Sequence, residues 1–348
     1  MKKKVLLMGA SGSGKTSMRS LIFSNNPASL TSRLGATIDV EQNHVRFLGD
    51  LILNLWDCGG QDAFMDSYLS TQRSVIFQHV GVLIYVFDVK ARDMSKDLVY
   101  YHDCIDALQK YSPDASVFLL VHKMDLVLQP ERQGVLARNR KDLETKSGVV
   151  PVTVFGTSIY DQSLYKAWSR IVHAIIPNAA VLTKHLTTFA QACSATEVIL
   201  FERTTFLIIA SSAVQPPPAS SLLTLPSSSP SHPSTSPILP PAPLTSSTSS
   251  LLSPAAAEAA RALNATRYER TSELIKALKH SCSRLREEFH SLEMELPEFT
   301  AVLDEMTKNT YVLVVVHDPT IETAALKINI RLARQKFEEL QSDSIFTK

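Results

Sequence analysis

The feature that most constrains this chain of 348 residues is a glycine-rich octapeptide between an apolar run and a helical pattern. It has the spacing G-x-x-x-x-G-K-[ST] and reads Gly9, Ala10, Ser11, Gly12, Ser13, Gly14, Lys15 and Thr16. Glycines in this strand–loop–helix context let backbone N–H groups turn inward around phosphates, assisted by the N-terminus of the helix. The octapeptide therefore predicts a phosphate-binding loop for a nucleotide.

The polar residues of this loop have expected roles. The Lys15 ammonium would reach the β- and γ-phosphates and support catalysis, and the Thr16 hydroxyl would ligate Mg²⁺. The remaining contacts to the nucleotide phosphates would come from Gly9, Ser11, Gly12, Ser13, Gly14 and Ser17.

A second phosphate motif follows the apolar run Leu51–Trp56 and contains Asp57, Gly60 and Gln61. An aspartate at the carboxyl end of a parallel strand can hold Mg²⁺ through water. Gly60 can offer its N–H to a γ-phosphate, and Gln61 can orient the attacking water for catalysis. Thr37, which lies between the first helix and the next strand, can bring a second hydroxyl to Mg²⁺ and order its loop while a nucleoside triphosphate is bound.

The base would be read by residues after two later strands. His122, Lys123 and Asp125 stand where GTPases carry N-K-x-D, and the Asp125 carboxylate can accept from guanine N1–H and N2–H₂. Adenine has no such pair of donors, so the site favours GTP over ATP. His122 replaces the usual asparagine and can still donate one hydrogen bond. Ser158 and Ile159 stand where a backbone N–H can contact guanine O6.

Residues 1–178 alternate short branched runs with helix-length segments, which predicts an α/β domain with a mostly parallel, doubly wound sheet. A helical stripe of spacing four, three and four closes this half and is stopped by Pro177. The runs predicted as strands are Val5–Met8, Leu51–Trp56, Val82–Phe87, Val117–Val121 and Val152–Phe155, and the closing helix carries Leu164, Trp168, Ile171 and Ile175.

Residues 179–348 predict a smaller α+β domain without internal repeats. Its expected order is helix, hairpin, insertion, helix, strands, helix. The insertion, residues 214–256, is mostly Pro, Ser, Thr, Ala and Leu, a composition that predicts disorder. The predicted elements are a helix from Leu182 to Cys193, strands Glu197–Phe201 and Thr205–Ala210 joined by a tight turn around Arg203, a helix from Leu274 to Leu292, a strand Tyr311–Val316 and a helix from Ile321 to Phe337.

Composition excludes several partners. The 35 basic and 34 acidic side chains leave a net charge of +1, which gives no bulk attraction to nucleic acid. No apolar run approaches the roughly 20 residues that span a bilayer, and no lipidation signal is present, so partners would hold the protein at any membrane. The four cysteines form no C-x-x-C pair, which fits a reduced cytoplasmic setting.

Segments in both halves carry a resemblance to a known family: residues 35–41, 45–49, 57–62, 122–127, 164–168, 200–203, 309–311 and 328–331. Together they resemble the Rag GTPases, the nutrient-signalling branch of the Ras-like superfamily, and their A/B subtype in particular. A histidine at the position of His122 is usual in that family.

The resemblance implies a GTP-hydrolysing switch that uses Mg²⁺ and pairs with a C/D-type Rag GTPase. Pairing would use a roadblock- or longin-like domain over residues 179–348. It also implies GTPase-activating and exchange factors, a membrane scaffold complex and the target of rapamycin kinase complex as partners. The expected location is the cytoplasm, peripherally on the vacuolar or lysosomal membrane.

Two features depart from the family pattern. The Pro/Ser-rich insertion falls where a short connection is expected, and Ser11 replaces a glycine at a position that crowds the γ-phosphate. The latter predicts slow intrinsic hydrolysis, and since no arginine stands in an obvious position to act in cis, a partner would supply one. Two alternatives remain at this point: a GTP-binding scaffold with negligible hydrolysis, against which Gln61 argues, and a trafficking-type small GTPase, against which the second-domain segments argue.

Overall fold

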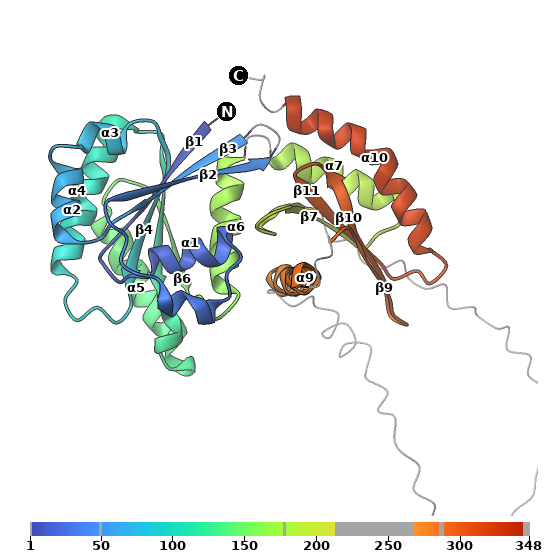
Figure 1. The fold of residues 1–348 in the computed structure, drawn as a ribbon, viewed down its shortest axis with the longest axis horizontal. Helices are drawn as coiled ribbons and strands as arrows, with labels where there is room; N and C mark the ends of the chain where they lie inside the picture. The colour runs from blue at the N-terminus through green and yellow to red at the C-terminus, as the bar shows by residue number, and fades with distance from the viewer. Residues whose placement is uncertain (1, 49–50, 177–178, 213–266, 285–288, 344–348) are drawn as a thin grey trace, which may run out of the picture.

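The computed structural model of this chain describes residues 2–48, 51–176, 179–212, 267–284 and 289–343. They form two β-sheets, one mostly parallel and one antiparallel, with helices on both faces of each (Figure 1). This confirms the predicted α/β fold followed by an α+β part. The segment 214–256, for which the sequence predicts disorder, lies outside the described residues.

The first sheet has the strand order β2-β3-β1-β4-β5-β6. All neighbouring strands run parallel except β2, which pairs antiparallel with β3. The runs predicted as strands correspond to β1, β3, β4, β5 and β6, whereas β2 was not predicted because its exposed edge carries Glu41, Gln42 and His44 rather than an apolar run. The bounds are β1 (Lys2–Met8), β2 (Val40–Leu48), β3 (Leu51–Cys58), β4 (Val80–Asp88), β5 (Ser116–His122) and β6 (Val152–Thr157).

Helices cover this sheet on both faces. The helices α1 (Lys15–Phe23) and α6 (Ser163–Ile175) pack on one face. The other face is covered by α2 (Asp62–Leu69), α3 (Arg73–Phe77), α4 (Ser95–Tyr111) and α5 (Arg132–Lys146). The predicted apolar stripe of α6 is buried, as its spacing requires. Short 3₁₀ helices are η1 (Ala28–Arg33), η2 (Met124–Leu126) and η3 (Gln129–Glu131).

The second sheet is antiparallel, with the order β8-β7-β11-β10-β9. The helices α7 (Ala179–Ala192) and α10 (Thr323–Asp343) pack on one face and α9 (Arg267–Arg284) on the other. Its strands are β7 (Glu197–Glu202), β8 (Ile208–Ser211), β9 (Leu292–Glu295), β10 (Thr300–Thr307) and β11 (Thr310–Val316).

Helix α6 joins the two sheets, because it contacts β8 and α9 as well as the first sheet (Figure 1). One apolar cluster runs from the α1–α6 face of the first sheet to the α7–α10 face of the second. Across this junction the Ile208 N–H donates to Ser169 Oγ at 3.1 Å, and Lys276 Nζ donates to the Tyr165 hydroxyl at 3.1 Å. The two parts therefore share one hydrophobic core.

Two predicted boundaries in this second part are wrong. The strand predicted at Thr205–Ala210 is β8, which begins only at Ile208, because the Glu202 carboxylate accepts hydrogen bonds from the Thr205 N–H and hydroxyl and holds a turn there. The helix predicted to reach Leu292 ends as α9 at Arg284. Leu292 instead begins β9 and pairs with β10, so sheet pairing overrides its helical spacing.

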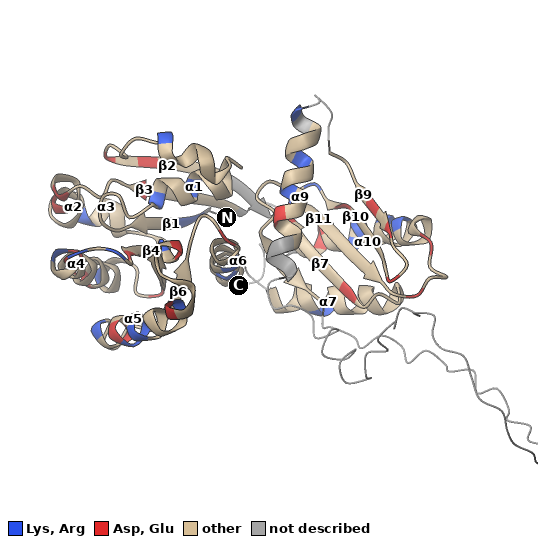
Figure 2. Ribbon diagram, turned by 90° about the horizontal axis from the view of Figure 1, so that it is seen from below, with Lys and Arg blue, Asp and Glu red and all other residues tan. Residues whose placement is uncertain are grey.

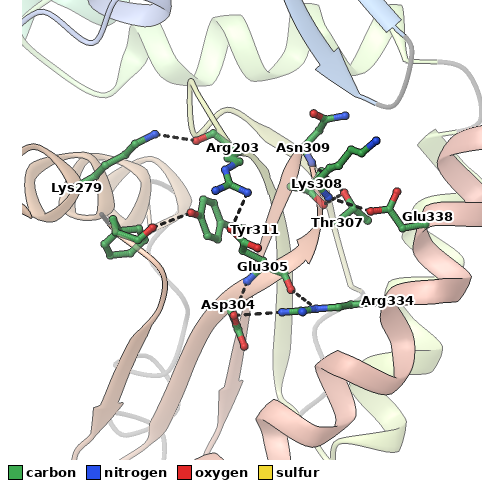
Figure 3. A network of polar contacts seen from close by, with 12 residues as sticks. Arg203, Lys279, Asp304, Glu305, Thr307, Lys308, Asn309, Tyr311, Arg334 and Glu338 are labelled. Atoms are coloured by element: carbon green, nitrogen blue, oxygen red, sulfur yellow. Dashed lines mark hydrogen bonds and ion pairs between the residues drawn. The ribbon is translucent and has the colours of Figure 1, made fainter. Parts of the chain in front are cut away.

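Polar contacts hold the β7–β8 connection against the β10–β11 hairpin and α9 (Figure 3). The Arg203 N–H donates to the Asn309 carbonyl oxygen at 2.9 Å, and the Arg203 guanidinium pairs with Glu305 at 2.6 Å. Lys279 Nζ of α9 donates to the Arg203 carbonyl oxygen at 3.2 Å. The predicted turn at Arg203 is thus present, and contacts from the β10–β11 hairpin and from α9 hold it in place.

Helices α4 and α5 carry both acidic and basic residues (Figure 2). Among the described residues, no helix combines the length and apolarity that crossing a membrane requires.

Candidate functional site

The predicted site residues meet at the carboxyl edge of the first sheet. Residues 9–16 follow β1. Residues 57–61, 122–125 and 157–159 include the last residues of β3, β5 and β6 and continue beyond them. The loop that carries Thr37 reaches the same edge, since the start of β2 pairs with the end of β3. Open α/β sheets bind ligands at this edge.

Two glycines of the octapeptide are required by close approaches. Gly9 has φ +136°, and a Cβ there would lie 2.3 Å from the Val86 carbonyl oxygen. Gly14 has φ +100°, and a Cβ there would lie 2.6 Å from His122 Cδ2. Any other residue would strain the backbone and collide with these neighbours. The loop therefore crosses directly over β4 and β5 before α1 begins.

Lys15 is buried at the centre of this loop, with 5 % of its surface exposed. Its Nζ donates to the Gly9 carbonyl oxygen at 2.8 Å and to the Ala10 carbonyl oxygen at 2.9 Å. Burial lowers the pKa of Lys15, and the Asp57 charge opposes that shift. Ser13 is buried in the same loop, whereas Ser11 and Gly12 are exposed and Ser17 is half-buried in α1.

The three predicted magnesium ligands lie together. Thr16 Oγ1 and Thr37 Oγ1 are 2.5 Å apart, and Asp57 is fully buried beside them. Asp57 Oδ2 lies 3.1 Å from Arg19 Nε, yet neither carboxylate oxygen accepts a well-aligned hydrogen bond from the described residues. Burial raises the pKa of Asp57, and the neighbouring Arg19 charge and Thr16 hydroxyl oppose that rise.

This donor set fits Mg²⁺. The cation prefers oxygen ligands and is usually bound through one or two carboxylates together with substrate phosphates. Two hydroxyls and one buried carboxylate with under-used oxygens supply such ligands. Arg19 was not predicted as part of the site, although its spacing of four from Lys15 places it on the same side of α1.

The segment after β3 packs against the glycine-rich loop of residues 9–16, called the phosphate loop below. A Cβ at Gly60 would lie 2.4 Å from the Gly9 carbonyl oxygen, and the Gly60 carbonyl accepts from the Ser11 N–H at 2.9 Å. Gln61 immediately precedes α2, and its Oε1 is buried without a hydrogen-bond partner in the described part of the chain. A buried amide oxygen in this state is available to a water or ligand.

The predicted base-reading residues are held by side-chain contacts. Ser158 Oγ donates to Asp125 Oδ1 at 2.6 Å. The Ser158 N–H donates to Ser163 Oγ at 3.0 Å, and Ile159 packs half-buried against the α6 side of the core. Lys123 has φ +63°, and its ammonium pairs at 2.6 Å with Asp88 at the end of β4.

His122 links the base segment to the phosphate loop. Its ring lies against Gly14, and its Nδ1 is 2.8 Å from Thr157 Oγ1 at the end of β6. The side chain is 1 % exposed, and burial lowers the pKa of His122 to about 4, so the ring is neutral at pH 7. The contact of Thr157 with His122 was not predicted from the sequence, in which Thr157 is only the first residue of the segment that contains Ser158 and Ile159.

Comparisons with known proteins agree with this geometry. A family model described as the Gtr1/RagA G protein conserved region matches residues 4–236. The GTP-binding protein gtr1 of Schizosaccharomyces pombe is 46 % identical, with 99 % of this chain and 98 % of the relative covered. The Ras-related GTP-binding protein B of Rattus norvegicus is 43 % identical, with 98 % of this chain and 87 % of the relative covered.

A more distant similarity has a different extent. The GTP-binding protein gtr2 of Schizosaccharomyces pombe is 27 % identical over 58 % of this chain and 64 % of its own length. The similarity to the gtr1 and Ras-related B proteins therefore extends over nearly the whole chain, whereas the similarity to gtr2 does not. With a glycine-rich phosphate loop at the edge of a parallel sheet and this family match over most of its length, the chain belongs to the Gtr1/RagA family of G proteins and is a Rag-type GTPase.

Proposed function

We propose that this GTPase is a magnesium-dependent switch whose nucleotide lies along the edge formed by residues 9–17, 37, 57–61, 122–125 and 157–159. The observation that carries the proposal is the buried Asp57 carboxylate with under-used oxygens beside the Thr16 and Thr37 hydroxyls. A buried carboxylate is costly unless partners compensate for its lost hydration, and the Arg19 guanidinium at 3.1 Å compensates Asp57 only in part, since neither carboxylate oxygen accepts a well-aligned hydrogen bond from the described residues.

The chain's own groups account for phosphate binding and water activation. Lys15 would exchange its carbonyl contacts for the β- and γ-phosphate oxygens, and the loop amides would surround them. The Gly60 N–H would face the γ-phosphate, and the Gln61 amide would orient the attacking water. Thr16, Thr37 and Asp57 would hold Mg²⁺, which when bound supplies positive charge against the phosphate oxygens.

Base selection would come from Asp125. Ser158 holds one carboxylate oxygen of Asp125, which fixes the direction of the group toward guanine N1–H and N2–H₂. Because the Ser158 N–H is already bonded to Ser163, we assign the contact to guanine O6 to the Ile159 N–H. His122 would act by fixing Gly14 and Thr157 relative to each other.

Single-turnover hydrolysis of GTP by the full-length chain, with and without candidate activating proteins, tests this function. Slow intrinsic turnover is expected because Ser11 crowds the γ-phosphate, and an activator that supplies an arginine would raise the rate by about 10³–10⁵. Gln61→Leu should bind GTP like the wild type and lose the stimulated rate. Gln72→Leu makes the same change beyond α2, where Gln72 contacts Ser67, and should retain it.

The outcomes separate the candidate functions. Stimulated turnover that persists in Gln61→Leu would remove this residue from the mechanism. Tight GTP binding without turnover under any activator would favour a scaffold that hardly hydrolyses GTP. A membrane location that does not depend on a paired chain would favour a trafficking-type GTPase.

We propose further that residues 1–178 form the GTPase unit and that residues 179–348 pair with a C/D-type Rag chain such as a gtr2 relative. The exposed apolar side chains Ile328 (55 %) and Leu332 (76 %) on α10 support an interaction surface in this part. Because α6 shares its core with β8, the test uses the full-length chain, not a truncation.

Coexpression with a C/D-type chain should give a 1:1 heterodimer in analytical ultracentrifugation, whereas expression alone should give self-association or aggregation. A stable monomer that ignores such a partner would contradict the pairing. In cells, a fluorescent fusion should lie on the vacuolar or lysosomal membrane only when the paired chain and a membrane scaffold complex are present. The activating and exchange factors and the target of rapamycin complex are proposed as further partners on the same basis.

A further inference from the structure

The residues proposed to bind the base lie on two separate segments, at the ends of the neighbouring strands β5 and β6. The first segment leads through η2 and η3 to α5, and the second leads to α6. In the proposed site guanine contacts both segments at once, so their relative position decides how well the base fits. A side chain that fixes this position would act on base binding without touching the base.

Arg132, the first residue of α5, connects the two segments. Its Nη2 donates to the Asp125 carbonyl oxygen at 3.2 Å, and its Nε donates to the Val127 carbonyl oxygen at 3.0 Å. Its Nη1 lies 3.8 Å from Oδ2 of Asp161, which belongs to the loop between β6 and α6. The planar guanidinium carries five N–H donors in a fixed fork, so one side chain can reach all three acceptors.

Hydrogen bonds within the second segment continue from Asp161 back to Asp125. Asp161 Oδ1 accepts from the Ser163 N–H at 2.9 Å and from the Ser163 hydroxyl. The Ser163 hydroxyl accepts from the Ser158 N–H at 3.0 Å, and the Ser158 hydroxyl donates to Asp125 Oδ1 at 2.6 Å. Together with the Arg132 contacts, these bonds form a closed circuit in which the backbone carbonyl of Asp125 and its carboxylate are both held.

We propose that Arg132 and Asp161 are positioning residues that set the direction of the Asp125 carboxylate toward guanine. The circuit also spans Ile159, whose N–H is assigned to guanine O6, because it holds the chain at Ser158 and at Asp161 on either side. The inference rests on the proposed base site and extends it to two residues that are not proposed to contact the nucleotide. Without the circuit, the two segments gain freedom that base binding must then remove.

Geometry rather than charge should carry this role. The side chains of Arg132 and Asp161 are 28 % and 36 % exposed, and an ion pair at such exposure contributes little by itself. Lysine keeps the positive charge, but its single ammonium lacks the planar fork that reaches two carbonyls and a carboxylate together. Arg132→Lys should therefore behave like Arg132→Gln.

The test measures base preference in variants of the full-length chain. Affinities for GDP and inosine diphosphate (IDP) are compared by competition with a fluorescent GDP analogue, and the melting temperature is measured alongside. Inosine lacks the 2-amino group from which Asp125 is proposed to accept, so the preference for GDP over IDP reports the direction of the carboxylate. Arg140→Gln is the matched control, because Arg140 lies on the same helix and also donates from Nη2 to a backbone carbonyl, that of Val154 in β6, at 3.2 Å.

Arg132→Gln and Arg132→Lys should each bind GDP about tenfold more weakly and lose about threefold or more of the preference for GDP over IDP, on the scale of one or two hydrogen bonds. GTP should weaken by the same factor as GDP, because both carry the same base. Asp161→Asn should weaken GDP by about threefold, since its amide oxygen can still accept from Ser163. Adding Asp161→Asn to Arg132→Gln should cost nothing further, because both act in one circuit. Arg140→Gln should stay within about twofold of the wild type for both nucleotides.

An unchanged preference for GDP over IDP in Arg132→Gln would reduce the circuit to a role in folding and overturn the inference. An Arg132→Lys variant that matches the wild type would also overturn it, since charge alone would then suffice. A wild type that binds GDP and IDP equally would instead reject the proposed contacts of Asp125 themselves. Should Arg132→Gln fail to fold, Arg132→Lys and Asp161→Asn decide by the same preference.

Discussion

The proposed nucleotide site has two halves: the residues proposed to bind the base, 122–125 and 157–159 (the base half), and those proposed to bind the phosphates, 9–16, 37 and 57–61 (the phosphate half). The polar groups of the two halves have different partners within the protein. In the base half each polar side chain has a protein partner: His122 with Thr157, Lys123 with Asp88 and Asp125 with Ser158. In the phosphate half the Asp57 oxygens and Gln61 Oε1 lack well-aligned partners among the described residues.

Such a division would let one guanine site serve both the GTP-bound and the GDP-bound state. A base half whose contacts are satisfied within the protein needs little rearrangement when nucleotide binds, so its contribution is the same for GTP and GDP. In the phosphate half, oxygens without well-aligned partners gain interactions when the ligand binds. The loops at Thr37 and Gln61 can therefore respond to the γ-phosphate.

The largest expected effect comes from Asp125→Asn in the base half. The amide donates where the carboxylate only accepted, so two charge-assisted bonds to guanine are lost, which should weaken GDP binding by about 3–6 kcal/mol. Affinity should move toward xanthine nucleotides, as measured by competition with GDP and XDP. Asp142→Asn, the same change at an exposed pair on α5, should leave affinity intact. Equal GDP affinity in Asp125→Asn would mean that the base half is wrongly assigned.

Thr16→Asn probes the phosphate half. Losing the hydroxyl that faces Thr37 should weaken Mg²⁺–GTP by about 1.5–3 kcal/mol, because a charge-assisted ligand is removed. Chelation of Mg²⁺ should accelerate nucleotide release from the wild type and add little to the variant. If chelation speeds release from both proteins equally, Thr16 is not a ligand of the ion.

His122→Asn tests whether the base half is preformed. The pKa of His122 is near 6.5 in the unfolded chain and about 4 in the folded chain, so between these values only the unfolded chain binds the proton. Folding stability therefore falls as the pH drops through this window, by about 2 kcal/mol from pH 7 to pH 5. Denaturant unfolding at both pH values should show that His122→Asn loses this component, whereas exposed His44→Asn keeps it. Identical pH slopes in wild type and His122→Asn would contradict the buried, neutral ring.

Ser158→Ala should have the smallest effect. It removes the donor to Asp125 Oδ1, so the carboxylate loses one hydrogen bond that orients it but keeps its charge. GDP should therefore bind about 1 kcal/mol more weakly. Ser147→Ala, which removes a buried hydroxyl that bonds Tyr101 far from the base half, should change stability but not GDP affinity. A loss as large as that of Asp125→Asn would show that Ser158 contacts the nucleotide itself.

Much of the fold follows from local patterns. The strands β1, β3, β4, β5 and β6 and the helix α6 are apolar runs or stripes, and their burial makes them visible in the sequence. The edge strand β2 is half solvated and shows no such run, and β9 follows α9 with apolar residues that happen to continue a helical spacing. Those two elements are edge strands that pair only with the strand that follows them in the chain, so they carry less of the burial that makes the inner strands recognisable.

In the proposed site, the contiguous motifs at residues 9–16, 57–61 and 122–125 could be recognised from the sequence alone, because each carries its own backbone geometry and donor groups. The structure was needed to find that His122 lies against Gly14 and is hydrogen-bonded to Thr157, and that Arg19 pairs with Asp57. These contacts join residues far apart along the chain, and the packing of helices on the sheet, not any local pattern, brings them within reach.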